Sequence, residues 1–481
     1  MGATSALGEL SERIHMASLN FAGSGQFFEF CSHKKIVIFP SRVHYALLNV
    51  LNEQKPREIA ARVLRNRQSQ TEFTEDLLER ALANARLSPA DRGLCQELVY
   101  GVVRAQSALN WLIERKTPGR EQPPDVQILL QLGLYQIFWL DRIPPHAATN
   151  ETVEQAKRSG LEPQAGFINA MLRGYLREEA EARKLLADLK TTQPATGYSH
   201  PEWLVKRWLE RWGPERTTRL LEWNNTPPRT FARLNRLKTD AAKLIAQWRE
   251  EGVTYDFTKA GPWPENQVFE LKSHPPLATL ASFRDGWFYL QDPSTLLAVT
   301  QLRPQPGESV LDYCAAPGGK TTYMAQMMNN QGRLVAHDVG EDRLRLIREN
   351  CQRLGVTCVQ PTLIPPSSSS AQQFDRILVD APCSNTGVMR RRVDLRWRIQ
   401  PFEITRLRTT QLALLDKAAA LVKPGGFIAY STCSIEPEEN QEVVAQFVSG
   451  HSNFKCLGEQ ALLPFQDGVD GAYVARLTRV S

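Results

Sequence analysis

Two cysteines of this sequence lie just after segments that read as buried strands. Cys383 is in Asp380-Ala-Pro-Cys-Ser384, and Cys433 is in Ser431-Thr-Cys-Ser434. A thiolate at such a position can attack a substrate and catalyse a reaction through a covalent intermediate. A single cysteine is more often a small buried hydrophobic residue. Two thiols at neighbouring strand ends, each close to a polar or acidic group, favour chemistry.

A metal site is the competing interpretation of these thiols. Zinc bound by thiolates needs further ligands at suitable spacing, and the sequence shows none near the two cysteines. The eight cysteines contain no C-x-x-C pair and no compact framework, which argues against a structural zinc site and a secreted disulfide scaffold. His337 has no obvious partner and is assigned to packing. We therefore expect no metal.

A glycine turn lies in Asp312-Tyr-Cys-Ala-Ala-Pro-Gly-Gly-Lys320, between an apolar run and a helical segment. This order is typical of an open α/β sheet, which binds ligands at the carboxyl ends of its strands. Gly318 and Gly319 let the backbone approach a ligand, and the first helical amides can face an anionic group. Cys314 stands where a phosphate-binding loop needs its first glycine, which excludes that motif. Taken alone, the segment also fits a glycine turn without a ligand.

Asp338 follows Gly318 by twenty positions, at the end of the next predicted strand. An acidic residue at this place accepts hydrogen bonds from a ribose diol. Rossmann-type dehydrogenases share the spacing. It therefore indicates a cofactor that contains a nucleoside, without indicating which one.

A sheet is needed to bring these residues together. Strand candidates alternate with helical segments from residue 286 to 481, which predicts a parallel doubly wound sheet. The predicted strands are Val310–Asp312, Arg333–Asp338, Thr357–Gln360, Arg376–Asp380, Gly426–Tyr430 and Tyr473–Leu477.

The preceding chain divides into three parts. Residues 1–54 show no clear periodicity, and no function is assigned to them. Residues 55–190 have the pattern of helices, and the nearly all-apolar Val126–Leu140 is predicted to be central. Residues 199–285, after a linker, predict a small α/β unit with a strand at Phe231–Asn235 and a helix at Ala241–Glu251.

Basic residues outnumber acidic ones between His200 and Arg249, and tryptophans are interleaved with them. Such a surface can follow RNA phosphates while aromatic faces hold bases. Alternatively, the tryptophans belong to the core and the charges to a solvated face. The tryptophans concerned are Trp203, Trp208, Trp212 and Trp223.

Composition is that of a soluble globular protein. The chain has 481 residues, of which 42% are hydrophobic and 23% charged, and its net charge of +6 permits a polyanionic partner. No apolar run is long enough to cross a membrane, and no signal peptide is evident. We expect a cytoplasmic protein with no membrane contact, and a monomer.

The helical part resembles the NusB-type RNA-binding domain. The resemblance implies an RNA-binding function, and an all-helical interaction or scaffold domain remains the alternative. The matching segments are Glu97-Leu-Val-Tyr-Gly101, Leu132-Gly-Leu-Tyr135, Asn150-Glu-Thr-Val-Glu154 and Phe167-Ile-Asn-Ala-Met-Leu-Arg173.

The cysteine and glycine segments resemble three motifs of the RNA cytosine-5 methyltransferases. Gln291-Asp-Pro-Ser294, Glu438-Glu-Asn440 and Asp467-Gly-Val-Asp-Gly-Ala-Tyr473 also fit that family. The resemblance implies a Rossmann-like class I methyltransferase sheet, S-adenosyl-L-methionine as cofactor, and RNA, ribosomal RNA above all, as partner. It implies cofactor binding by Cys314, Ala315, Ala316, Pro317, Gly318, Gly319, Lys320, Asp338 and Asp380.

The same resemblance assigns the catalytic roles. Cys433 is implied as the nucleophile that adds to carbon 6 of cytosine and makes carbon 5 reactive. Cys383 assists release of the product, and Asp380 holds the N3/N4 edge of the ring. Lys320 is placed to stabilise a thiolate. The base must leave its stack to be attacked, so single-stranded or flipped RNA is expected.

Arginines follow the Asp380 motif on the same edge of the sheet. Arg390, Arg391, Arg392 and Arg396 are predicted to contact RNA phosphates, although a charge run is also consistent with a solvated face.

Two positions depart from the family pattern. An acidic residue near the adenine is usual after the third strand, and Pro361 stands there. No adenine-binding acid is therefore assigned. Arg390-Arg-Arg-Val-Asp394 replaces a common Arg-Arg-His-Pro-Asp. Methylation of transfer RNA and a non-catalytic RNA-binding assembly factor remain as alternatives.

Overall fold

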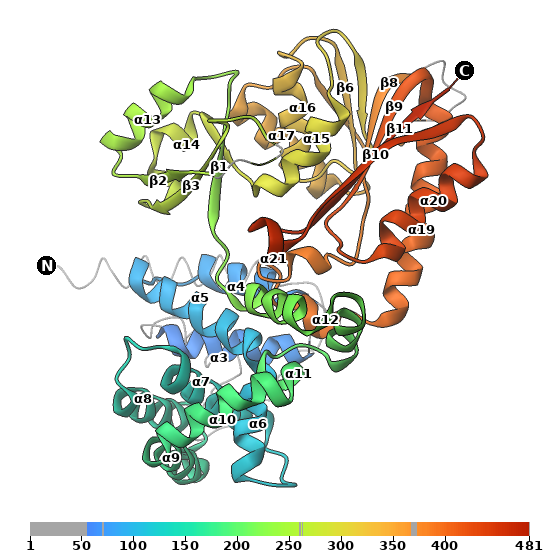
Figure 1. Cartoon of the computed structure of the whole chain (residues 1–481). Coiled ribbons are helices and arrows are strands. Elements are labelled where there is room, and N and C mark those ends of the chain that lie inside the picture. The colour runs from blue at the N-terminus through green and yellow to red at the C-terminus, as the bar shows by residue number, and fades with distance from the viewer. Residues whose placement is uncertain (1–54, 70–71, 259–260, 262, 367–372, 481) are drawn as a thin grey trace, which may run out of the picture. The chain divides into compact units, whose positions relative to one another are not determined.

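The computed structural model describes residues 55–69, 72–258, 261, 263–366 and 373–480. The N-terminal extension predicted at residues 1–54 lies outside the described residues. Within them the fold has a helical part, a small sheet and a large sheet (Figure 1), as the sequence predicts.

The helical part is built around one helix that is apolar on nearly all sides. This central helix, α7, is buried almost continuously from Val126 to Phe138, as predicted. Ser88 caps α5, since its side chain accepts a hydrogen bond from the Asp91 amide. The helices are α3 (Pro56–Ser69), α4 (Thr74–Ala83), α5 (Pro89–Arg104), α6 (Gln106–Lys116), α7 (Pro124–Trp139), α8 (Pro145–Arg158), α9 (Glu162–Arg177) and α10 (Glu179–Thr192).

The connection between the helical part and the small sheet is mostly helical. The predicted linker did not include a helix. The short α11 (Pro194–Gly197) precedes the much longer α12 (Glu202–Asn225). α12 is kinked where Gly213 has a φ of 73° and Pro214 follows. One face of α12 packs through the fully buried Trp208.

The small sheet is antiparallel, in the order β2-β3-β1-β4. α13 (Ala241–Glu250) covers it through the buried Trp248. The predicted strand and helix are confirmed, and three further strands were not foreseen. The strands are β1 (Thr230–Leu234), β2 (Thr254–Phe257), β3 (Val268–Ser273) and β4 (Phe288–Leu290).

The large sheet has the order β10-β11-β9-β8-β5-β6-β7. Its strands from β9 to β7 are parallel, while β10 and β11 are antiparallel additions. The strands are β5 (Ser309–Asp312), β6 (Arg333–His337), β7 (Val359–Thr362), β8 (Phe374–Asp380), β9 (Val422–Thr432), β10 (Phe454–Leu462) and β11 (Ala472–Arg479).

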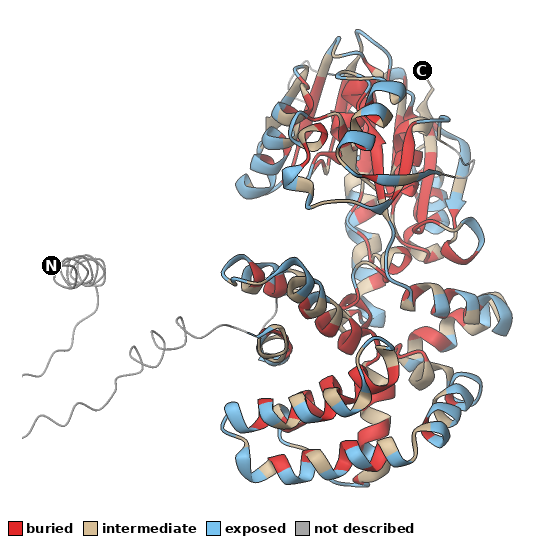
Figure 2. Ribbon diagram, turned by 90° about the vertical axis from the view of Figure 1, so that its left-hand side faces the viewer, coloured by how far each residue is buried: buried red, intermediate tan, exposed pale blue. Residues whose placement is uncertain are grey.

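Helices cover both faces of this sheet, so its central strands are buried on each side. Val310 packs with the helices of one face, and the next residue, Leu311, packs with those of the other. Figure 2 shows the strands buried and the outer helix surfaces exposed. The first face carries α15 (Leu296–Leu302), α16 (Gly319–Met327) and α17 (Glu341–Leu354), and the second carries α19 (Pro401–Leu421) and α20 (Gln441–Gly450) (Figure 1).

Two loops at the carboxyl ends of β8 and β9 meet through a glycine. Gly387 donates its amide hydrogen to the Cys433 carbonyl at 3.0 Å, and Gly471 donates to the Gly387 carbonyl at 2.8 Å. A Cβ atom on Gly387 would lie 2.6 Å from the Cys433 carbonyl oxygen and 2.7 Å from the Gly471 Cα. The absence of a side chain at Gly387 therefore sets how closely the loops approach.

Gly387→Ala is expected to push the Cys433 loop away and to lower the free energy of unfolding by about 1–3 kcal/mol, as overpacking does. Gly93→Ala is the control, because a Cβ on this helical glycine meets nothing within 4 Å. It should stabilise the protein by about 0.5–1 kcal/mol. Urea denaturation measures both changes, and a Gly387→Ala protein as stable as the wild type would contradict the packing argument.

Candidate active site

The glycine turn joins β5 to α16 and is fixed by the acid at the end of β6. The Asp338 carboxylate accepts hydrogen bonds from the Ala316 amide at 2.9 Å and the Val339 amide at 2.8 Å, and it pairs with Arg343 at 2.7 Å. These donors hold the carboxylate beside the turn. Oδ1 accepts from both Val339 and Arg343, whereas Oδ2 accepts only from Ala316, so the second lone pair of Oδ2 suits a ribose hydroxyl.

Two adjoining cavities open beside this turn. The first, of about 510 Å³, reaches Asp338, and the second, of about 560 Å³, reaches Phe231 and Tyr289 of the small sheet. Both contain Cys433 in their lining. The predicted cofactor residues that line one or both are Cys314, Ala315, Ala316, Pro317, Gly319, Lys320, Asp338 and Asp380.

Gly318 is the exception among the predicted cofactor residues. It lines neither cavity, and a Cβ on it would meet Ile347 of α17 at 3.4 Å. Its φ of 100° makes the turn that starts α16. Its role is therefore conformational. Pro361, which stands where the family usually has an acidic residue, lies in β7 beside Ala336. It provides no carboxylate there.

Asp312, at the end of β5, is an acceptor that sequence reasoning did not assign. One oxygen accepts from the Thr321 hydroxyl at 2.6 Å, while the other is buried without a hydrogen-bond partner. Burial raises the pKa of Asp312 to about 7, although the Thr321 hydrogen bond opposes this. The residue lines the second cavity. An unsatisfied carboxylate beside the turn fits the ammonium group of S-adenosylmethionine.

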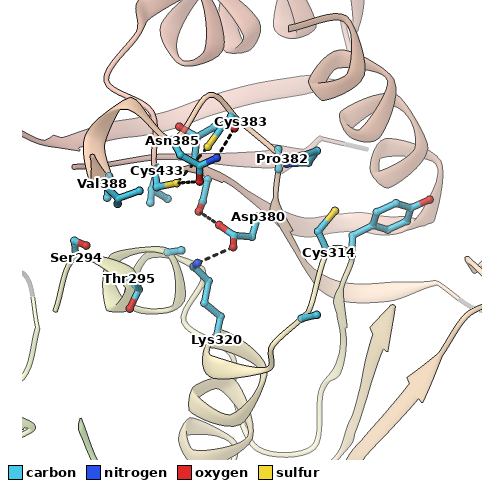
Figure 3. A pocket seen from close by; sticks show the side chains of 18 of the residues that line it. Ser294, Thr295, Cys314, Lys320, Asp380, Pro382, Cys383, Asn385, Val388 and Cys433 are labelled. Atoms are coloured by element: carbon cyan, nitrogen blue, oxygen red, sulfur yellow. Dashed lines mark hydrogen bonds and ion pairs between the residues drawn. The ribbon is translucent and has the colours of Figure 1, made fainter. Parts of the chain in front are cut away.

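Lys320 and Asp380 form an ion pair in the floor shared by the two cavities. The Nζ and Oδ2 atoms are 2.6 Å apart, and the Ser431 hydroxyl donates to the other oxygen of Asp380 at 2.7 Å (Figure 3). Burial acts to lower the pKa of Lys320, but Asp380 outweighs it and the pKa is raised. Lys320 is therefore charged at neutral pH, and its charge also interacts with Cys433.

The structure brings the two predicted catalytic cysteines together. Their sulfur atoms are 3.3 Å apart, although fifty positions separate them in the chain. The Cys433 thiol donates to the Asn385 Oδ1 at 3.0 Å, and the Asn385 amide group donates to the Cys383 carbonyl at 2.7 Å (Figure 3). Asn385 was not predicted. Its positive φ of 57°, which asparagine tolerates, directs its side chain between the loops.

The two thiols differ in their surroundings. Contact with Cys433 and burial raise the pKa of Cys383 well above its ordinary value, so Cys383 keeps its proton. Cys383 is 8% exposed and lines only the first cavity, whereas Cys433 is more exposed and lines both. Cys433 is therefore the thiol that a ligand in either cavity reaches.

The buried Glu439 holds both cysteine loops. It accepts hydrogen bonds from the Ser384 amide at 2.8 Å, from the Ser434 hydroxyl at 2.5 Å and from the Ser384 hydroxyl. The Gln411 amide group adds a further donor at 3.1 Å. Burial raises the pKa of Glu439 in spite of these donors. The sequence motif contained this residue, but its spacing did not reveal its function.

Two of the four arginines that were predicted to contact RNA phosphates are buried. Arg390 is 1% exposed, pairs with Asp470 at 2.7 Å and lies over the Trp223 ring. Arg396 is fully buried. A buried charge needs partners inside the protein because it has lost its contact with water. Both arginines therefore contribute to the packing of loops.

The other two arginines remain accessible to different degrees. Arg391 is partly exposed and pairs with Asp470 and Asp292. Arg392 is exposed and lines both cavities, so it remains a proposed phosphate contact. Among the predicted base-binding tryptophans, Trp208 is a core residue, and Trp203 and Trp212 pack against the same cluster.

Comparison with known proteins agrees with this geometry. The family model for the 16S rRNA methyltransferase RsmB/F matches residues 299–478, the NusB family matches 54–177, and the ferredoxin-like domain of RsmF/B-like methyltransferases matches 200–263. A probable ribosomal RNA small subunit methyltransferase B of Synechocystis is 36% identical over 449 residues, covering 88% of this chain and 99% of its own. The ribosomal RNA small subunit methyltransferase B of Escherichia coli O157:H7 is 37% identical over 407 residues, covering 82% and 92%.

Two solved structures are also similar. The crystal structure of PH0851 has a TM-score of 0.71, 23% identity and coverage of 89% of this chain and all of that chain, which shows the fold alone. A methyltransferase homologue from Pyrococcus horikoshii is 31% identical, with a TM-score of 0.52 and coverage of 59% of this chain and 96% of that chain.

The sheet, the glycine turn and the acid after the second parallel strand define a Rossmann-like domain for a cofactor that contains a nucleoside. The matching family model and relatives are methyltransferases, so the class is that of S-adenosylmethionine-dependent methyltransferases. The similarity over most of the chain makes the assignment narrower. The chain belongs to the ribosomal RNA small subunit methyltransferase B family. Within the described residues no cluster of three or more metal-ligating side chains is found, and no helix is long and apolar enough to cross a membrane.

Binding of S-adenosylmethionine is expected to release protons from Asp312. With a pKa of about 7, its carboxyl group is partly protonated at pH 6.5 in the free protein. A cation bound beside it lowers that pKa, so binding at this pH expels part of a proton. Asp312→Asn should remove this release and weaken binding by roughly tenfold, the loss of one charged hydrogen bond.

Calorimetry in buffers of different ionisation enthalpy measures the release. Asp342→Asn is the control, because Asp342 is an exposed carboxylate on α17. Equal proton release by the wild type and Asp312→Asn would show that another group accounts for it.

Proposed function

We propose that this protein transfers a methyl group from S-adenosylmethionine to carbon 5 of a cytosine in small-subunit ribosomal RNA. The observation that carries the proposal is the pair of sulfur atoms 3.3 Å apart at the ends of β8 and β9, in cavities continuous with the glycine turn. The names of the curated relatives support ribosomal RNA as the substrate. We expect the enzyme to act in the cytoplasm as a monomer.

The chemistry explains why a thiol is needed. Carbon 5 of cytosine belongs to an aromatic ring and is a poor nucleophile. Addition of the Cys433 sulfur to carbon 6 breaks the conjugation and makes carbon 5 enamine-like. Bound S-adenosylmethionine supplies an electrophilic sulfonium methyl group. Loss of the carbon 5 proton and elimination of the sulfur restore the ring, so the products are 5-methylcytosine, S-adenosylhomocysteine and a proton.

The neighbouring residues have distinct proposed roles. Asp380 holds the N3/N4 edge of the base, and its ion pair with Lys320 fixes the carboxylate in place. Lys320 also favours the thiolate of Cys433. Cys383 assists product release. The exposed Arg392 contacts an RNA phosphate near the target base.

The cofactor residues are proposed on the same grounds. The backbone of Ala315, Ala316, Pro317 and Gly319 lies against the cofactor, and Cys314 adds its side chain to the cavity. Asp338 binds the ribose hydroxyls. Because Pro361 provides no carboxylate, the adenine is held by packing and backbone groups.

Transfer of a labelled methyl group separates the enzyme from its alternatives. Incubation of purified protein with tritiated S-adenosylmethionine and small-subunit ribosomal RNA should yield labelled 5-methylcytosine. Labelled transfer RNA in its place would favour a tRNA methyltransferase. RNA binding without any transfer would favour a non-catalytic assembly factor.

The two cysteines should differ in a trapping experiment. Cys383→Ala is expected to accumulate a covalent protein–RNA species, because the adduct forms but is released slowly. Cys433→Ala should form none and lose methyl transfer by about a thousandfold or more, as removal of a nucleophile does. Denaturing gel electrophoresis with labelled RNA detects the adduct.

Cys456→Ala is the matched control, since Cys456 is an exposed thiol on β10. It should behave as the wild type. Accumulation of the adduct in Cys433→Ala and its absence in Cys383→Ala would exchange the two roles.

A further inference from the structure

A third cavity lies in the helical part of the chain. Its volume is about 530 Å³, and its walls come from α5, α7 and α10 and from the α11–α12 segment. None of its lining residues lines either catalytic cavity. The catalytic mechanism does not use it.

An arginine without an acidic partner lies in its wall. Arg104, in the last turn of α5, is 9% exposed, and its Nε has no hydrogen-bond acceptor. Among the residues that the structure describes, it makes no ion pair. Its guanidinium interacts with the Tyr135 hydroxyl, a neutral group that itself donates to Glu97 at 2.6 Å. A buried cation normally has a partner that compensates its charge, so Arg104 is suited to an anionic ligand.

A second buried guanidinium strengthens the positive potential. Arg396 donates to the Ser199 carbonyl at 3.2 Å and to the Asn225 Oδ1 at 2.7 Å, and both of these residues line the cavity. Its Nε also lacks an acceptor, and its hydrogen-bond partners are neutral oxygens. Burial and the charge of Arg104 lower the pKa of Arg396 to about 9. Two like charges held this close favour a bound anion.

The remaining walls combine basic and aromatic groups. Arg183 and Lys190 are exposed residues of α10 that line the cavity. Arg183 pairs with Glu179 and binds the Phe138 carbonyl, whereas Lys190 lies over the Tyr198 ring. Trp139 stacks on Tyr135 with ring centres 5.7 Å apart. The acidic groups of the cavity are Glu97 and Glu222, which accept hydrogen bonds from the hydroxyls of Tyr135 and Tyr198.

We propose that this cavity binds one nucleotide of the RNA substrate, with its phosphate at Arg104 and Lys190 and its base against Trp139. Guanidinium and ammonium groups bind phosphate through charge-assisted hydrogen bonds, and an aromatic face stacks on any base. The volume lies within the range of small-ligand sites. The inference rests on the proposed function only in taking RNA as the ligand. The cavity would hold the RNA at a point apart from the target cytosine.

Salt-dependent RNA binding by the full chain tests the site. Arg104→Gln and Lys190→Ala should each weaken binding of a small-subunit ribosomal RNA transcript roughly fivefold to tenfold, measured by fluorescence anisotropy. Each should also reduce the slope of log Kd against log salt by about 0.7–0.9, the loss of one phosphate contact. The KM for RNA should rise, while kcat at saturating RNA stays within about twofold of the wild type.

Lys184→Ala is the matched control, since Lys184 is exposed on α10 but does not line the cavity. It should leave the slope unchanged. If Arg104→Gln fails to fold, as judged by thermal unfolding, Lys190→Ala and Trp139→Ala decide the question. Wild-type affinity and slope in the folded variants would overturn the proposal, as would a loss of kcat at unchanged affinity.

The two proposals fail in different ways. If the wild type binds RNA but makes no 5-methylcytosine, the proposed reaction is wrong while the binding measurements still report on the cavity. If the wild type methylates cytosine and the cavity variants bind normally, only the nucleotide site is wrong.

Discussion

The close approach of two loops depends on one buried carboxylate. Glu439 lies beneath the Cys383 and Cys433 loops and accepts hydrogen bonds from Ser384 and Ser434, the residues that follow the two cysteines. An isolated carboxylate would be costly to bury, and these donors offset that cost. Because the same group binds both loops, neither can move without leaving acceptors unsatisfied. The sulfur atoms stay close for this reason, and the proposed covalent chemistry depends on it.

A second set of buried charges fixes the entrance to the site. Asp470 and Asp292 bind Arg390 and Arg391, which belong to the loop that begins at Cys383. Trp223 of α12 covers the Arg390 guanidinium at 4.0 Å. The loop is therefore attached both to the end of the sheet domain and to the helix that precedes the small sheet. An exposed Arg392 remains directed to solvent between these anchors, where an RNA strand can reach it.

The same loop continues to the helical part of the chain. Asp394 accepts from Arg67 at 2.6 Å and from the Thr74 amide at 3.2 Å, and the Trp397 ring donates to the Val103 carbonyl at 2.8 Å. One continuous segment thus extends from a proposed catalytic cysteine to Arg396, which binds Ser199 and Asn225 in the wall of the third cavity. This connection gives a physical route by which RNA in the proposed nucleotide site can be kept in register with the proposed nucleophile.

Much of the architecture could be predicted because it depends on local pattern. The central helix α7 and the middles of β5, β6, β8 and β9 are apolar runs, and their burial follows from that composition. β10 was missed because it is an edge strand whose residues are mostly exposed, so its sequence has no alternation to detect. The strands β2 to β4 are short and lie among turns, and the short α11 lies within the segment predicted as a linker.

The sequence by itself determined the identity of the chemical groups: two thiols, an acid at each relevant strand end, and a glycine turn with a lysine. Those groups follow from motifs whose spacing is fixed along the chain. Only the tertiary structure decided which groups meet. The distance between Cys383 and Cys433 and the burial of Arg390 and Arg396 arise from contacts between segments far apart in sequence. The same contacts leave one oxygen of Asp312 and the Nε of Arg104 buried without a hydrogen-bond partner. The sequence gives the charge of a side chain but not its surroundings. The fold decides whether that charge meets water, a partner or neither.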